Sequence, residues 1–230
     1  MIPKTNSLQT IGPQQMEYER AFELQNELLK RCIESEGKEN FLLLLEHTPT
    51  ITIGRTGDPS DVTATSAVLS EKGVKVVQTN RGGKVTFHGP GQLVAYPIID
   101  LHHRSKDLHR YLKDLQNWLI ALLGEFDIQA TGSSPHTGVW TTRGKVASIG
   151  IAVRRWCTYH GIALNIAPDM SFFDLLNPCG LREIPMVSMA QLTDKDVSFE
   201  YVVRRAEAHF RDYFGFAPSV ETKTHEVGAR

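Results

Sequence analysis

Hydrophobic residues recur at helical spacing in three segments of the chain. After Pro13, apolar side chains return every three or four positions from residue 18 to residue 33, a pattern typical of a helix with one buried face. Residues 107–123 (DLHRYLKDLQNWLIALL) form the clearest helix, with Asp107 placed to cap its start and Gly124 to end it. A third helix is predicted over 199–214. We expect all three helices to pack on a sheet.

Runs of β-branched and aromatic residues predict strands between these helices. The runs cover residues 40–46, 74–79, 92–101, 138–142, 145–153 and 158–166, with a hairpin turn at 154–157. The strands come in clusters and do not alternate strictly with helices, which argues against a doubly wound parallel sheet. We therefore expect an α/β (α+β) fold, in which helices pack on a mixed, largely antiparallel sheet.

The length and composition are those of a globular protein. The chain has 230 residues, of which 41% are hydrophobic and 22% charged, and no Pro-, Gly- or Ser-rich linker divides it. We expect one domain over residues 13–220, with flexible ends at 1–12 and 221–230. A net charge of -1 does not supply the basic field of nucleic-acid binders. Without an apolar signal segment or a run long enough to span a bilayer, the chain is expected to be cytoplasmic and to have no membrane partner.

Residues 78–96 (QTNRGGKVTFHGPGQLVAY) are the most unusual stretch. Glycine-rich turns at 81–83 and 89–91 bracket a short strand at 85–87. The known phosphate-binding loops do not fit this stretch, because they lead into a helix and a strand follows here. Two interpretations stay open. The segment either brings its backbone close to a ligand, with Arg81 and His88 as polar tips, or it is a pair of hairpin turns with an incidental histidine.

Three widely spaced cysteines without a C-x-x-C pair indicate reduced thiols. Cys32 falls on the apolar face of the first helix and is expected to be a core thiol. Cys157 lies in the predicted hairpin next to two arginines, which favour a thiolate, but no partner base is evident. Cys179 stands between Pro178 and Gly180, a turn that can present its side chain as a nucleophile.

Lys145 opens an otherwise apolar strand, KVASIGIAV. One interpretation is an edge lysine that keeps its ammonium group in water. The other is a functional lysine beside a strand whose small residues, Ala147, Ser148 and Gly150, leave room for a substrate chain.

Four blocks resemble, in order and approximate spacing, the signature of the octanoyltransferases of lipoate biosynthesis. RGGKVTFHGPGQ at 81–92 is similar to R-G-G-x-x-T-aromatic-H-x-x-G-Q, and GKVASIG at 144–150, HGIALN at 160–165 and NPCG at 177–180 are similar to the blocks that follow. Two positions differ from the residues commoner in that family: Lys84 replaces a glutamine or arginine, and Phe87 replaces a tyrosine or tryptophan. The resemblance covers roughly residues 47 to 179.

The resemblance implies a fold like the catalytic domain of the biotin/lipoyl protein ligases and an ATP-independent acyl transfer. The donor would be octanoyl-acyl-carrier protein. The acceptors would be lysines in the lipoyl domains of 2-oxoacid dehydrogenases and in the glycine-cleavage H protein. Cys179 matches the nucleophile that carries the acyl group as a thioester, and Lys145 matches the lysine that tunes it.

Other positions match residues that contact the substrate. They are Arg81, Gly82, Gly83, Lys84, Val85, Thr86, Phe87 and His88, then Ser148, Ile149 and Gly150, and then Gly161, Ile162 and Ala163. His47 and His160 are expected near the site.

We expect neither a cofactor nor a metal. Three clustered histidines, His102, His103 and His109, lack the spacing of a ligand set. Two other functions stay open: an ATP-dependent lipoate or biotin protein ligase of the same fold, and a non-catalytic module that binds an acyl group or its carrier.

Overall fold

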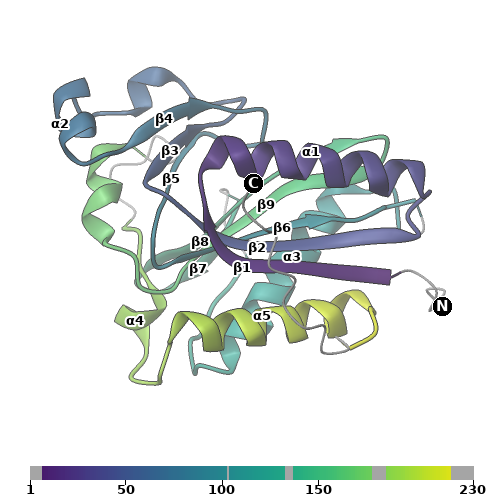
Figure 1. Ribbon diagram of the computed structural model, residues 1–230. Coiled ribbons are helices and arrows are strands. Elements are labelled where there is room, and N and C mark those ends of the chain that lie inside the picture. Colours follow the sequence, from purple (N-terminus) through teal and green to yellow (C-terminus); the bar gives the residue numbers. More distant parts are fainter. Residues whose placement is uncertain (1–6, 103, 133–136, 178–184, 219–230) are drawn as a thin grey trace.

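A six-stranded sheet forms the centre of the molecule (Figure 1). The computed structural model describes residues 7–102, 104–132, 137–177 and 185–218. In spatial order the strands are β1 (Ser7–Met16), β2 (Glu39–His47), β6 (Gln92–Ile98), β9 (Cys157–Asn165), β8 (Gly144–Arg154) and β7 (Val139–Thr141). β1 runs parallel to β2, whereas every other neighbouring pair is antiparallel. The prediction of a mixed, largely antiparallel sheet is confirmed.

A second sheet of three strands lies beside one end of the first (Figure 1). β3 (Thr50–Ile53) is its central strand, parallel to β4 (Lys75–Gln78) and antiparallel to β5 (Val85–His88). The 3₁₀ helix η1 (Pro59–Asp61) and the short helix α2 (Ser66–Glu71) connect β3 to β4. Apolar side chains of this sheet and of the 3₁₀ helix η2 (Met170–Leu175) form a core cluster of their own.

The long helices cover the two faces of the large sheet (Figure 1). α1 (Tyr18–Glu34) packs on one face, and α3 (Leu108–Gly124) and α5 (Phe199–Phe214) pack on the other; α4 (Met189–Leu192) is a single turn. All three predicted helices are confirmed. The Asp107 side chain caps α3, and Gly215 ends α5 in the left-handed conformation at φ 68°.

The strand β1 begins at Ser7, inside the segment 1–12 that we expected to be flexible. Of the described strands, β2 alone pairs with it, so β1 sits at the edge of the sheet. All of its side chains are exposed or half-buried, and the register shifts between Ile11 and Gln14. A strand placed in this way shows no alternation of apolar and polar residues, and such alternation is the signal that identifies strands in a sequence.

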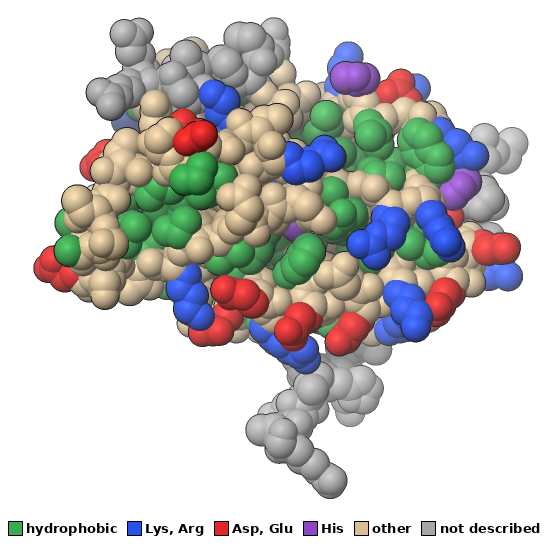
Figure 2. Space-filling view, turned by 90° about the horizontal axis from the view of Figure 1, so that it is seen from above, with side chains coloured by type: hydrophobic (Ala, Val, Ile, Leu, Met, Phe, Trp, Pro, Cys, Tyr) green, Lys and Arg blue, Asp and Glu red, His purple; other side chains and the backbone are tan. Residues whose placement is uncertain are grey.

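Acidic and basic side chains are interspersed on the face of the molecule seen from above α1 (Figure 2). This mixed surface agrees with the net charge of -1. Among the helices in the described parts of the chain, none is long and apolar enough to cross a bilayer.

Candidate active site

A cavity of about 340 Å³ lies between the two sheets, a volume within the usual range for small-molecule sites. The loop before β5 crosses β8 there, and the Gly82 amide donates to the carbonyl oxygen of Ile151 at 2.9 Å. Fourteen of the residues that the sequence named line this cavity: Arg81, Gly83, Lys84, Val85, Thr86, His88, Lys145, Ser148, Ile149, Gly150, His160, Gly161, Ile162 and Ala163. Three sequence blocks far apart in the chain therefore meet around one space.

The sequence missed three lining residues, Thr56, Tyr96 and Thr137. Tyr96 stands in an apolar strand and Thr137 in a loop, so neither carries a sequence signal of its own. Conversely, Phe87 points away from the cavity, because successive side chains of a strand alternate between its faces. Its ring stacks on Phe172 at 4.7 Å, in the core of the small sheet.

The predicted nucleophile, Cys179, lies outside the described residues. The described chain stops at Asn177 and resumes at Pro185. The Asn177 amide donates to the carbonyl oxygen of Asp61 at 2.7 Å, and the Lys145 amide donates to that of Pro185 at 3.0 Å.

Arg81 is buried and reaches back to β3. Its Nε and Nη2 donate to Thr52 Oγ1 at 3.1 and 2.8 Å, and Nη2 also donates to the Thr52 carbonyl oxygen at 2.7 Å. Thr52 Oγ1 lies 3.2 Å from His88 Nε2. Because the guanidinium can only donate, the Thr52 hydroxyl is free to donate to the imidazole. This chain of contacts fixes the guanidinium at the cavity wall.

His88 continues the same network toward the large sheet. Gln92 Nε2 donates to the Phe87 carbonyl oxygen at 3.0 Å and to Asn165 Oδ1 at 2.9 Å, so Gln92 Oε1 is left to accept from His88 Nδ1 at 2.8 Å. Both imidazole nitrogens are therefore engaged. Burial, reinforced by the charges around it, holds the His88 pKa well below its ordinary value. His88 is a neutral link in this network, and neither of its nitrogens is available as a base.

Asn165 carries the network to the candidate catalytic lysine. Its Nδ2 donates to the Val187 carbonyl oxygen at 3.0 Å, and the Val187 amide donates to the Lys145 carbonyl oxygen at 3.0 Å. The histidine and glutamine of the first sequence block and the asparagine of the third thus hold the backbone around Lys145.

His47 and Tyr96 form a second buried pair. His47 Nδ1 donates to the Met16 carbonyl oxygen at 2.9 Å, which leaves Nε2 to accept from the Tyr96 hydroxyl at 2.8 Å. Burial lowers the pKa of His47 to about 4 and raises that of Tyr96 well above its ordinary value. Both groups are neutral at physiological pH. His47 lies behind Tyr96 and does not line the cavity among the described residues.

His160 interrupts β9 with a left-handed backbone conformation at φ 56°. Its amide leaves the sheet ladder and donates to Gln25 Oε1 of α1 at 2.8 Å. The ring stacks on Phe22, and its Nε2 lies 2.7 Å from Asn80 Oδ1. Burial, followed by the nearby charge of Arg81, lowers the His160 pKa to about 3. The imidazole is a neutral wall of the cavity.

Lys145 is only 5% exposed, so it is not an edge lysine with its head in water. It lies between β7 and the segment at 185–187. Gly144 permits this approach, since a Cβ at that position would lie 2.2 Å from the Pro185 carbonyl oxygen. A buried lysine that lines a cavity can act as a proton donor in its charged form and as an acceptor in its neutral form.

Two glycines bring backbones together at the cavity wall. A Cβ on Gly150 would lie 2.7 Å from the Gly82 carbonyl oxygen, and a Cβ on Gly161 would lie 2.1 Å from that of Ala95. Gly150 therefore admits the loop of the first sequence block, and Gly161 admits the neighbouring strand. The small residues of β8 were expected to leave room for a substrate chain, and this loop fills part of that room.

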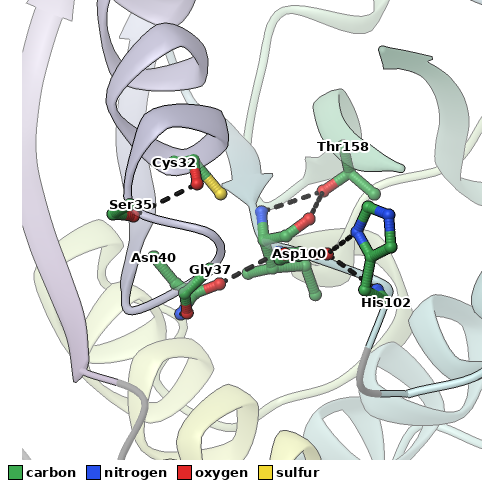
Figure 3. Close-up of polar contacts among 8 residues, drawn as sticks. Cys32, Ser35, Gly37, Asn40, Asp100, His102 and Thr158 are labelled. Carbon is green, nitrogen blue, oxygen red and sulfur yellow. Dashed lines mark hydrogen bonds and ion pairs between the residues drawn. The ribbon is translucent and has the colours of Figure 1, made fainter. Parts of the chain in front are cut away.

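The other two cysteines lie together in the core between α1 and the sheet. Cys32 is fully buried, and its contact with Cys157 together with burial raises its pKa. Figure 3 shows Cys32 beside Asp100, whose carboxylate binds His102 Nδ1 at 2.7 Å. These thiols have the environment of inert core residues, as predicted for Cys32. Cys157 begins β9, whereas the sequence placed it in the hairpin turn.

Comparisons with known proteins agree with this arrangement. The model of the lipoyl protein ligase A/B catalytic domain matches residues 17–211. An octanoyltransferase of Geobacter metallireducens is 44% identical over 85% of this chain and 88% of its own length. One from Geotalea uraniireducens is 41% identical over 86% and 89%. The resemblance inferred from the four sequence blocks is confirmed.

Solved structures with the same fold are more distant in sequence. A lipoate-protein ligase A bound with ATP has a TM-score of 0.74 and 13% identity, over 95% of this chain and 89% of the other. A putative lipoate protein ligase from T. acidophilum with bound lipoic acid has a TM-score of 0.71 and 14% identity, over 92% and 87%. Fold, sequence and family model agree, and this chain belongs to the lipoyl protein ligase A/B catalytic domain family.

Proposed function

We propose that this protein is an octanoyltransferase that moves an octanoyl group from a carrier-protein thioester to a lysine of a lipoyl domain, through a thioester on Cys179. The observation that carries the proposal is the buried Lys145 at a cavity built from three of the four sequence blocks. The names of the curated relatives support the same reaction. The acceptors would be 2-oxoacid dehydrogenases and the glycine-cleavage H protein, and the enzyme would act in the cytosol as a single domain.

The hydrogen bonds around the undescribed segment support a role for Cys179. The Asn177 amide is tied to Asp61, and Pro185 is tied to the Lys145 backbone. Cys179 follows Asn177 by only two residues along the chain. Pro185 is therefore held beside Lys145, which lines the cavity, and the thiol would act together with this lysine.

The chemistry proceeds in two proton-balanced steps. The Cys179 thiolate attacks the carrier thioester, the new sulfur–carbon bond replaces the old one, and the ammonium group of Lys145 protonates the departing carrier thiolate. The acceptor amine then attacks the acyl-cysteine, neutral Lys145 takes the amine proton, and the Cys179 thiolate leaves. Thiol exchange is nearly thermoneutral and amide formation is downhill, so the reaction needs no ATP.

The cavity supplies a place for the acyl chain. Each enclosed methylene stabilises the complex by roughly 0.8 kcal/mol. Burial of even half of an octanoyl tail would therefore contribute a useful share of the binding free energy. Ile149, Ile162 and Ala163 offer apolar surface, while His88 and His160 are neutral and present no charge to the chain.

Transfer to a lipoyl domain without ATP tests the proposal. We expect octanoyl-lysine to form from octanoyl-carrier protein alone, to be lost in Cys179→Ser and to persist in Cys157→Ala, which removes a core thiol. A requirement for ATP and free octanoate would instead identify a ligase. Carrier binding without any covalent product would identify a non-catalytic module.

A further inference from the structure

Lys145 faces Trp140 directly across the antiparallel pair of β7 and β8. Directly opposite residues in such a pair have side chains on the same face of the sheet. Lys145 Nζ lies 5.3 Å from the centroid of the Trp140 ring, within the range of a cation–π interaction. The lysine is 5% exposed and the tryptophan 8%, so little water competes for this contact.

Gly138 leaves the space that the lysine side chain occupies. Its backbone has φ 150°, and a Cβ at this position would lie 2.4 Å from Lys145 Cε and 3.1 Å from Nζ. Any side chain at position 138 would therefore displace the ammonium group. Trp140 provides a surface for the lysine, and Gly138 opens the path beside that surface.

The helix α3 also holds this arrangement. Gln116 Nε2 donates to the Gly138 carbonyl oxygen at 2.9 Å and to the Gly132 carbonyl oxygen at 3.1 Å. Trp140 and Thr131 exchange two backbone hydrogen bonds of 2.8 and 2.9 Å. Gly132 and Gly138 are thus both held by Gln116 before any substrate enters.

Trp140 is not among the described residues that line the cavity, whereas Lys145 is. We therefore expect an effect of Trp140 on the reaction to pass through Lys145. We infer that Trp140 and Gly138 are positioning residues: the indole face holds Lys145 as an ammonium group at the cavity, along a path that Gly138 leaves open. The inference rests on the catalytic role proposed for Lys145.

The ionisable groups near Lys145 can contribute to a pH profile of the reaction. Among the described residues, the cavity carries Arg81, Lys84, His88, Tyr96 and His160 as titratable groups. Within the described parts of the chain, the segments that pair with Lys145, at 137–141 and 185–188, carry no ionisable side chains. Besides these, the thiol of Cys179 is the group proposed to titrate with the lysine.

The test is the pH profile of acylation by octanoyl-carrier protein in single turnover, with Trp140→Leu and Trp140→Phe. The ring favours the ammonium form, so Trp140→Leu is expected to move the alkaline limb down by about 0.5 to 1 pH unit. Trp140→Phe keeps an aromatic face and should stay near wild type, and the KM for the carrier should not change. Wild-type profiles in both variants would overturn the inference.

A double-mutant cycle separates positioning from packing. Trp140→Leu should slow acylation about 3- to 10-fold when Lys145 is present and by less than about twofold in a Lys145→Met background. An equal loss in both backgrounds would assign Trp140 a packing role. If Lys145→Met alone acylates at the wild-type rate, the proposed function of Lys145 fails instead.

If Trp140→Leu does not fold, the same pH profile can be measured with a fluorinated tryptophan at position 140. Fluorine keeps the shape of the ring and withdraws negative charge from its face. The alkaline limb should then move down stepwise with each added fluorine, and a fixed limb would overturn the inference.

Discussion

Gln92 and Asn165 are joined by a hydrogen bond of 2.9 Å from the Gln92 carboxamide nitrogen to Asn165 Oδ1. Both side chains are 1% exposed. The bond links the sequence block that contains His88 to the block that begins at His160, and through Val187 it reaches the backbone of Lys145. The polar residues of two separate blocks are therefore parts of one buried network.

We predict that Gln92→Leu lowers the free energy of unfolding by about 1–3 kcal/mol, because His88 and Asn165 each lose a buried partner. Asn165→Leu should have a similar effect, and the double variant should cost less than the sum, with a coupling of at least about 0.5 kcal/mol. Urea unfolding measures all three. Asn117→Leu, at a half-buried position on α3 outside the network, serves as the additive control. Additivity of Gln92→Leu with Asn165→Leu would contradict the network.

Lys145→Met should slow transfer from acyl-Cys179 to the acceptor lysine more than it slows acylation. Lowering a thiol pKa from ~8.5 to ~6.5 gains only about threefold in rate at pH 7 once the loss of nucleophilicity is included. Proton transfer is worth ~10²–10⁴-fold, and the acceptor amine, with a pKa of ~10.4, needs it most. Single-turnover rates of the two half-reactions decide; a greater loss in acylation would make Lys145 chiefly a thiolate activator.

Gly150→Ala should reduce acyl acceptance by about 10- to 100-fold while the protein stays folded. The added Cβ would meet the Gly82 carbonyl oxygen at 2.7 Å and push the loop that carries Arg81. Displacements of about 1 Å at a site cost rates of this size. Gly124→Ala is the matched control, because a Cβ there meets nothing within 4 Å. Equal activity of the two variants would show that the position of this loop does not matter.

Stability should fall as the pH drops below about 6.5. Burial lowers the pKa of His47 to about 4 and that of His160 to about 3, while both titrate near 6.5 in the unfolded chain. The unfolded state therefore binds more protons between these values, and each histidine removes about 2 kcal/mol between pH 7 and pH 5.

The variant His47→Gln isolates one of these contributions. Between pH 7 and pH 5, the loss in its free energy of unfolding should be about 2 kcal/mol smaller than the loss in the wild type. His109→Gln, at an exposed position on α3, controls for the substitution itself. The same pH dependence in His47→Gln and wild type would contradict the buried neutral state of His47.

The sequence predicted the elements that carry their own local signals. Asp107 marks the start of α3 and Gly215 the end of α5, and the apolar face of α1 repeats at helical spacing. β3 (Thr50–Ile53) is too short to show a period, and β1 lies at an exposed edge, so neither was predicted. Propensity and period report only on structure that is local in the chain or buried on one face.

The residues around the cavity were predicted through the resemblance of three sequence blocks, and the finer geometry was not. The opposition of Trp140 and Lys145 depends on a register shift between Val139 and Trp140, which no local pattern reveals. Phe87 points away from the cavity and into the core of the small sheet. Its packing against Phe172 determines which side chains of β5 face the cavity. Contacts of this kind arise from how strands and loops meet in three dimensions.

Intact-mass spectrometry of the enzyme after mixing with octanoyl-carrier protein, without ATP, tests the covalent mechanism most directly. We predict one added octanoyl group per chain, mapped by peptide analysis to Cys179, and its disappearance when a lipoyl domain is added. An adduct on Cys32, Cys157 or a lysine, or no adduct unless ATP is supplied, would contradict the mechanism.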